Sequence, residues 1–167
     1  EIRWFTPATE VDLCGHATLA SAYVIQHFEP NVENRIALFS PRSGNLYVHV
    51  EHDLFALDFP TDILQEVELT DVLKKATDKI PLKAFRGKTD YMLVFENQHD
   101  IETMVPDLPV INQLDARGLI VTAAGKTHDF VSRFFGPAVG VDEDPVCGSA
   151  HTTLIPYWAS QLSKNKL

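Results

Sequence analysis

Two short stretches of this sequence place a cysteine next to a glycine, and they repeat one another. Cys14-Gly15-x-Ala17 recurs as Cys147-Gly148-x-Ala150, at an offset of 133 residues. Upstream, Arg3-Trp-Phe-Thr-Pro-Ala8 recurs as Arg133-Phe-Phe-Gly-Pro-Ala138 at an offset of 130, so three residues are inserted between the two blocks. Both cysteines of the chain therefore fall at matching points of one internal repeat.

A cysteine at the start of a helix can supply a reactive thiol. The unbonded backbone N–H groups and the positive end of the helix dipole stabilise a thiolate there. A following glycine lets a substrate approach the backbone closely, and the N–H groups beside it can hold a carboxylate or enolate oxygen. We therefore expect substrate-binding positions in both repeats, at Gly15, Ala17, Gly148, Ser149 and Ala150.

Two such turns that face each other would put an acid and a base on opposite faces of one substrate carbon. That arrangement performs racemisation or epimerisation, and a proton returned to a different carbon gives isomerisation. Buried structural thiols are the alternative interpretation, because a free cysteine is commonly buried. The matched repeat favours the catalytic interpretation of Cys14 and Cys147.

Polar side chains next to the cysteines extend this candidate site. His16 follows Gly15 in the first helical turn, where it can act as an acid, a base or an orienting donor. Asp144 lies three residues before Cys147 and can accept a proton or cap a backbone N–H; Asp12, near Cys14, has the same two interpretations. Ser149 can donate to a substrate oxygen or cap the helix.

Metal and cofactor sites are less well matched by the sequence. Cys14, His16, Cys147 and His151 supply the ligand types of a tetrahedral zinc site. However, Cys-x-His is not the usual ligand spacing, and residues two apart at a helix start point in different directions. No phosphate-binding glycine loop or dinucleotide fingerprint occurs. We expect no metal and no cofactor.

Composition limits the choice of partner and compartment. The chain has 167 residues, is 45% hydrophobic and 22% charged, and carries a net charge of −9, which disfavours nucleic acid or an anionic membrane as partner. No apolar run is long enough to span a membrane. Two cysteines without a framework pattern indicate reduced thiols and a cytoplasmic location. We expect a small carboxylated substrate, no nucleic-acid or membrane partner, and a homodimer as one possible assembly.

Secondary-structure patterns place the two cysteines at the starts of two helices. Helical spacing of apolar residues predicts a helix over 15–28 that is apolar on nearly all faces and therefore buried. A second helix is predicted over 148–162, a shorter one over 71–77 capped by Thr70, and helical turns at 100–104 and 110–114. Residues 8–12 are predicted as a loop. Strands are predicted over 3–5, 35–39, 46–51, 54–59, 91–96, 119–124 and 130–135.

The break at Pro60-Thr-Asp62 is the best boundary between two lobes. We expect residues 1–62 to form part of an N-terminal lobe and residues 63–167 part of a C-terminal lobe. The first residues are already strand-like and the last ones follow directly on a helix, so we expect the fold to continue beyond both ends.

The two repeat segments, together with Phe39-Ser-Pro-Arg-Ser-Gly44 and Pro156-Tyr-Trp158, resemble the PhzF-like isomerases of phenazine biosynthesis. These belong to the diaminopimelate epimerase-like fold, and proline racemase is a relative. The resemblance implies an α+β fold of two pseudo-symmetric lobes, each a curved sheet around a central helix, with the active site between them. It also implies that His16, Asp144 and Ser149 belong to the catalytic centre, with a glutamate that would precede Glu1.

The resemblance leaves the mechanism open, because the racemase relatives use cysteines as their two bases at the positions of Cys14 and Cys147, whereas PhzF itself lacks them. The first hypothesis is a cofactor-independent biosynthetic isomerase of the PhzF-like type, with acid/base transfer by Asp144, His16 and the two thiols. The second is a two-cysteine amino-acid racemase or epimerase. The third is a non-catalytic ligand-binding or redox-responsive protein in which the two cysteines form a reversible disulfide.

Overall fold

The structure, a computed structural model, describes residues 1–29 and 33–167 as a mixed α+β chain with two compact units. The first unit comprises Glu1–Pro60 and Val146–Ser149, and the second comprises Thr61–Pro145 and Ala150–Leu167. The lobes expected from the sequence were residues 1–62 and 63–167. They differ from these units chiefly in the segment Val146–Ser149, which the sequence assigned to the second lobe. Within the described residues, no helix combines the length and apolar character that a membrane span requires.

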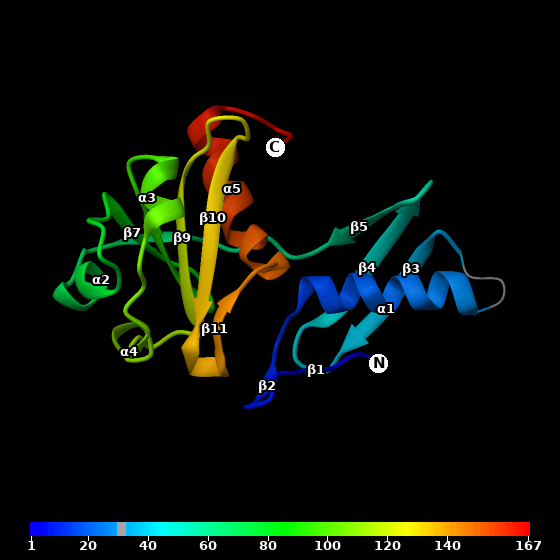
Figure 1. Cartoon of the computed structure of the whole chain (residues 1–167). Coiled ribbons are helices and arrows are strands. Elements are labelled where there is room, and N and C mark those ends of the chain that lie inside the picture. Colours follow the sequence, from blue (N-terminus) through cyan, green and yellow to red (C-terminus); the bar gives the residue numbers. More distant parts are fainter. Residues whose placement is uncertain (30–32) are drawn as a thin grey trace. The chain divides into compact units, whose positions relative to one another are not determined.

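The first unit contains a three-stranded antiparallel sheet with one helix packed on it (Figure 1). The strands, in spatial order, are β3 (Arg35–Ser40), β4 (Gly44–Glu51) and β5 (Leu54–Asp58). As predicted, β4 and β5 form a hairpin, in which Glu51 pairs with Leu54 across a tight turn. His52 in this turn has a φ of 57°, which suits the twist of a two-residue hairpin loop.

Helix α1 (Gly15–Phe28) has the predicted bounds, but the prediction that it is buried all round is wrong. Ala22 packs with Ile36, Val48 and Val50 of the sheet. On the other side, Tyr23, Val24 and Phe28 are 51%, 53% and 76% exposed. A single three-stranded sheet covers only one face of a helix, so apolar composition alone did not determine burial.

A two-stranded ribbon precedes α1. It pairs β1 (Trp4–Phe5) with β2 (Glu10–Val11), with Trp4 opposite Val11. The prediction of a loop over 8–12 is therefore wrong at Glu10 and Val11. These two residues are extended because the β1 backbone supplies the cross-strand partners that a local pattern cannot reveal.

The second unit is built on a six-stranded sheet in the order β11-β10-β9-β8-β7-β6 (Figure 1). Neighbouring strands are antiparallel except β8 and β9, which are parallel and joined by a crossover that contains two short helices. The helices of this crossover are α3 (Gln98–Thr103) and α4 (Leu108–Ile111). The strands are β6 (Gln65–Val67), β7 (Lys83–Arg86), β8 (Asp90–Val94), β9 (Gly118–Ala124), β10 (Phe130–Gly136) and β11 (Val141–Asp144).

Helices cover both faces of this sheet. Leu119, Val121 and Ala123 of β9 pack in one cluster with residues of α2 (Asp71–Lys75), α3 and α4. Because side chains alternate along a strand, Thr122 points to the opposite face, where α5 (His151–Leu162) lies. Trp158 of α5 donates its indole N–H to the Thr122 hydroxyl at 2.9 Å. The predicted cap of α2 is confirmed, since the Thr70 hydroxyl accepts from the Leu73 amide.

A buried ion pair fixes the start of the parallel strands. Asp90 of β8 is 2% exposed, and Arg117, just before β9, donates from Nε to one of its carboxylate oxygens at 2.9 Å. The guanidinium also pairs with the second oxygen and lies 4.9 Å from the centre of the Phe134 ring. The pair ties β8, β9 and β10 together at one end of the sheet.

Candidate functional site

The two Cys-Gly turns of the repeat come into backbone contact within the first unit. A Cβ added to Gly15 would lie 3.0 Å from the Cα of Gly148, and one added to Gly148 would lie 3.1 Å from the Cα of Gly15. Neither glycine has a positive φ. Glycine is therefore needed at both positions for close approach of the two chains, and not for an unusual backbone conformation.

His16 links the two turns through its ring. Nδ1 lies 3.1 Å from the carbonyl oxygen of Val146, and Nε2 lies 3.5 Å from Sγ of Cys14. Because a carbonyl can only accept, this contact places the proton of the neutral ring on Nδ1 and leaves Nε2 as an acceptor. Sγ also lies 3.8 Å from Nδ1, so the thiol lies beside the ring, within reach of both nitrogens and nearer to Nε2. This geometry makes a thiol–imidazole pair that can exchange one proton.

The second turn pairs its thiol with a hydroxyl. Sγ of Cys147 lies 3.5 Å from Oγ of Ser149, and either atom can be the donor. Ser149 is 7% exposed, whereas both cysteines are half-buried and neither forms a disulfide. The two halves of the repeat thus present the same thiol with different partners, an imidazole at one turn and a hydroxyl at the other.

The two turns also begin their helices differently. Cys14 is the N-cap of α1, in an extended conformation, and its carbonyl accepts from the amide and the hydroxyl of Thr18 at 3.1 and 2.7 Å. After Cys147 the chain forms a 3₁₀ turn, η2 (Gly148–Ala150), before α5 begins. The prediction of an α-helix from residue 148 is therefore wrong by three residues, because the chain first makes the tighter turn common at helix ends.

An arginine–glutamate fork precedes each turn at the same point of the repeat. Arg3 donates from two nitrogens to the two carboxylate oxygens of Glu10, both at 2.9 Å, and Arg133 does the same to Glu143 at 2.7 and 2.9 Å. The hydrogen bonds from these arginines lower the pKa of Glu10 and of Glu143. Each fork braces the two strands that lead into a Cys-Gly turn.

The structure also locates the three residues inserted in the second repeat. Trp4 pairs with Val11 in the first unit, and Phe134 pairs with Asp144 in the second, which is the same step of the repeat. The second connection is longer because it contains a 3₁₀ helix, η1 (Pro137–Val139), which ends at Gly140 with a φ of 74°. The insertion lengthens this connection and keeps the pairing at the step of Phe134 and Asp144, while the register shifts by one residue between Phe134 and Gly136.

Comparison with known proteins assigns the chain that carries this duplicated site to a family. The model of the PhzC-PhzF family, described as "Phenazine biosynthesis-like protein", matches residues 1–167. The chain belongs to the PhzC-PhzF family. An uncharacterized isomerase of Pseudomonas aeruginosa is 48% identical over 167 residues, which cover 99% of this chain and 63% of that protein. The chain thus spans less than two thirds of the length of this relative.

Solved PhzF-family structures have the same fold. A PhzF-family protein of Enterococcus faecalis matches with a TM-score of 0.87 and 39% identity, over 97% of this chain and 62% of that one. A PhzC/PhzF protein of Clostridium difficile matches with a TM-score of 0.84 at the same identity and coverage. The expected family and the α+β, diaminopimelate epimerase-like fold class are both confirmed.

The remaining residues predicted from the sequence have the following places. Asp144 is half-buried at the end of β11, and Ala150 is buried in η2; both belong to the second unit. Ala17 lies in the first turn of α1. Asp12 is 59% exposed and its carboxylate pairs with Arg42 at 3.1 Å. The expected roles of these residues stay predictions.

Two contributors to the site were missed at the sequence level. The Val146 carbonyl, which orients His16, gives no sequence signal, because any residue supplies a backbone carbonyl. Arg42 lies in a segment that was interpreted only as a turn and as a point of family resemblance. In the part of the chain that the structure describes, no group of three or more His, Cys, Asp or Glu side chains is arranged to hold a metal ion.

Proposed function

We propose that this protein is a cofactor-independent isomerase of the PhzF-like type, which moves a proton on a small carboxylated metabolite. The observation that carries the proposal is the backbone contact between Gly15 and Gly148, which gathers Cys14, His16, Cys147 and Ser149 in one unit. The description of the Pseudomonas aeruginosa relative as an uncharacterized isomerase supports it.

In the proposed reaction, the substrate carboxylate binds the backbone N–H groups at the two Cys-Gly turns. A base removes a proton from a substrate carbon, and the released electron pair is delocalised toward the carboxylate. The proton returns to the opposite face or to a conjugated carbon, so no oxidant or reductant is needed. Asp144 and His16 are the proposed acid/base groups, and the Cys14 thiol can relay a proton through the imidazole of His16.

Exchange of substrate hydrogen with solvent deuterium tests this proposal. A panel of small carboxylic acids is incubated with the protein in heavy water, and deuterium incorporation is followed by mass spectrometry or NMR. We expect incorporation into at least one acid, lost in Asp144→Asn and His16→Gln and retained in the exposed neighbour control Asp142→Asn. Absence of exchange across the panel would favour a non-catalytic ligand-binding protein.

A two-cysteine racemase is the second candidate, and the equivalent thiols favour it. Cys14 and Cys147 are both half-buried, and each has a polar partner 3.5 Å from its sulfur. If the thiols are the two bases, Cys14→Ser and Cys147→Ser each abolish exchange. If both variants retain turnover and Asp144→Asn abolishes it, the two-cysteine racemase is excluded.

Cellular location and assembly belong to the same proposal. We place the protein in the cytoplasm, where cysteines stay reduced, and its two cysteines are thiols in the structure. A homodimer is the proposed assembly. Sedimentation of the purified chain tests the assembly, and fractionation of cells tests the location.

A further inference from the structure

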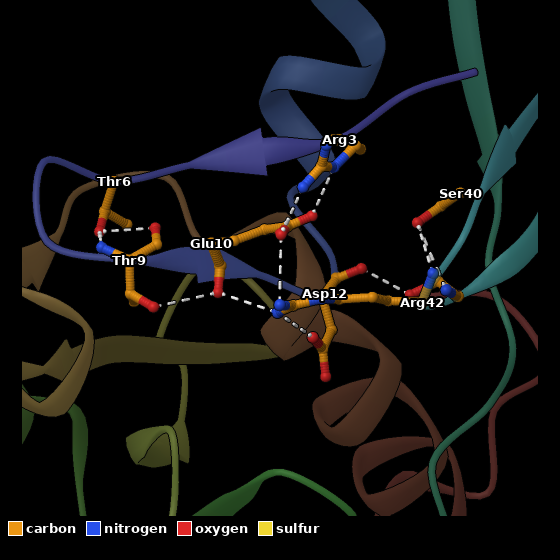
Figure 2. A network of polar contacts seen from close by, with 8 residues as sticks. Arg3, Thr6, Thr9, Glu10, Asp12, Ser40 and Arg42 are labelled. Atoms are coloured by element: carbon orange, nitrogen blue, oxygen red, sulfur yellow. Dashed lines mark hydrogen bonds and ion pairs between the residues drawn. The ribbon is translucent and has the colours of Figure 1, made fainter.

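Arg42 joins the turn between β3 and β4 to the segment immediately before Cys14 (Figure 2). One terminal nitrogen donates to the backbone carbonyl of Glu10 and to the carboxylate of Asp12, both at 3.1 Å. The other lies 3.2 Å from the Glu10 carboxylate, which Arg3 already holds. One guanidinium thus contacts three polar groups, two of Glu10 and one of Asp12.

The neighbouring serines strengthen this attachment. The Ser43 hydroxyl donates to the backbone carbonyl of Asp12 at 2.5 Å. The Ser40 hydroxyl accepts from the amides of Arg42 and Ser43, both at 3.3 Å, and so closes the turn that presents the arginine. Arg42 is therefore a prearranged donor, although its side chain is 46% exposed.

In the part of the chain that the structure describes, the second half of the repeat has no counterpart of Arg42. There, the third nitrogen of Arg133 donates to the carbonyls of Ile101 and Met104 at 3.1 and 2.8 Å. Among the described residues, Glu143 pairs with Arg133 and with no second arginine. The repeat position of Asp12 is occupied there by Pro145, which has no charge to neutralise. The half of the repeat that has the extra carboxylate, Asp12, is thus also the half that has the extra arginine, Arg42.

We propose that Arg42 is a positioning residue of the candidate site, which acts on the Cys14–His16 pair by neutralising the charge of Asp12. Asp12 precedes Cys14 by two residues, so the two Cα atoms are within about 7 Å of each other. An uncompensated carboxylate at roughly that distance disfavours a thiolate by about 0.4–1.7 pH units, for dielectric constants between those of water and a protein surface.

The other charges on this segment are already matched. Glu10 is held by Arg3, and His16 is bonded to the Val146 carbonyl. Among the described residues, Arg42 is therefore the only cation that pairs with the carboxylate of Asp12. The same neutralisation would favour a substrate carboxylate beside Gly15, and this part of the inference rests on the proposed function.

Alkylation of a single thiol tests the inference without a substrate. In the full chain carrying Cys147→Ser, the rate of Cys14 modification by iodoacetamide is measured across pH. We expect Arg42→Gln to raise the midpoint of this profile by about 0.4–1.7 pH units. Arg42→Lys should restore the midpoint, and so should Asp12→Asn added to Arg42→Gln. Arg35→Gln is the matched control, because Arg35 lies over the Tyr47 ring in the same sheet.

A purely structural role predicts a different pattern. Lysine cannot reproduce the several hydrogen bonds of Arg42, so Arg42→Lys would then fail as Arg42→Gln does, and Asp12→Asn would not rescue. That pattern, or an unchanged midpoint in Arg42→Gln, overturns the inference. If Arg42→Gln does not fold, Asp12→Asn alone must lower the midpoint, and the absence of a shift overturns the inference equally.

This test is separate from that of the proposed function. A shifted alkylation profile without deuterium exchange would uphold Arg42 and reject the isomerase. Deuterium exchange together with an unshifted alkylation profile would uphold the isomerase and reject the role of Arg42. If both hold, Arg42→Gln is expected to raise KM more than it lowers kcat, with Arg42→Lys restoring KM.

Discussion

Replacing Gly15 by alanine tests whether close backbone contact holds the candidate site together. In a helix, alanine is normally preferred over glycine by about 0.5–1 kcal/mol. At Gly15 the added methyl would lie 3.0 and 3.3 Å from the Cα and carbonyl carbon of Gly148. These are backbone atoms, which cannot rotate away as the end of a side chain can, so the two chains must separate.

The magnitude follows from the balance of these two effects. Overpacking a closed contact costs about 1–3 kcal/mol, and subtracting the helix preference leaves a net destabilisation of about 0–2.5 kcal/mol, with a central value of about 1 kcal/mol. For a chain of this size the central value corresponds to a fall in Tm of about 2–4 °C. Urea and thermal unfolding measure it, and an alanine variant more stable than the wild type would contradict the reasoning.

The matching substitution at Gly148 makes the test specific to this contact. Its methyl would lie 3.1 Å from the Cα of Gly15, so each variant separates the same two chains. Once one methyl has separated them, the second costs less, and the double variant should be less destabilised than the sum of the single ones. Additive free energies would show that Gly15 and Gly148 act independently. Gly44, whose φ is +76° and whose added methyl meets nothing within 4 Å, controls for conformational strain alone.

Three further predictions concern the second unit. Asp90→Asn leaves the charge of Arg117 without its buried partner and should cost about 3–5 kcal/mol in urea unfolding; a loss below about 1 kcal/mol would contradict the structural role of the pair. The hydrogen bond from Arg133 lowers the pKa of Glu143. The stability that this ion pair contributes is therefore present above the unfolded pKa of about 4.3 and is lost as pH falls through the lower folded pKa. Unfolding free energies of Glu143→Gln should therefore lose less between neutral and acid pH than those of the wild type, and parallel curves would refute this. Burial raises the pKa of Tyr157, so the stability that its neutral phenol contributes is present below the unfolded pKa of about 10 and is lost as pH rises through the higher folded pKa. Ultraviolet titration should show a phenolate step at high pH that Tyr157→Phe removes.

Strands with a strong apolar pattern could be predicted from the sequence, whereas short charged strands could not. β9 and β10 were located because runs such as Leu119 to Ala124 have strand character without any partner. β11, with the sequence Val141-Asp-Glu-Asp144, has poor intrinsic strand propensity and is held by pairing with β10 and by the Arg133–Glu143 fork. Its structure depends on neighbours that a local pattern does not contain.

The candidate site shows the same division. The internal repeat was sufficient to identify Cys14, Cys147, His16 and Ser149, because matched positions can be read directly from the chain. The hydrogen bond from His16 to the Val146 carbonyl could not be predicted, because it joins residues 130 positions apart and uses a backbone atom.

The duplicated frame explains how one repeat can present two different chemistries. The parts that set geometry are the same in both halves, namely the arginine–glutamate forks and the two glycines in contact. The positions beside the thiols differ, with His16 in one half and Ser149 in the other, and the step occupied by Val11 in one strand is occupied by Asp144 in its counterpart. A proton transfer in which the acid and the base are different groups can use such a frame, which holds different side chains on the same backbone geometry. Replacement of His16, which is exposed, by serine, the residue at the matching position 149, should therefore preserve stability better than Gly15→Ala, while it removes the imidazole beside Cys14.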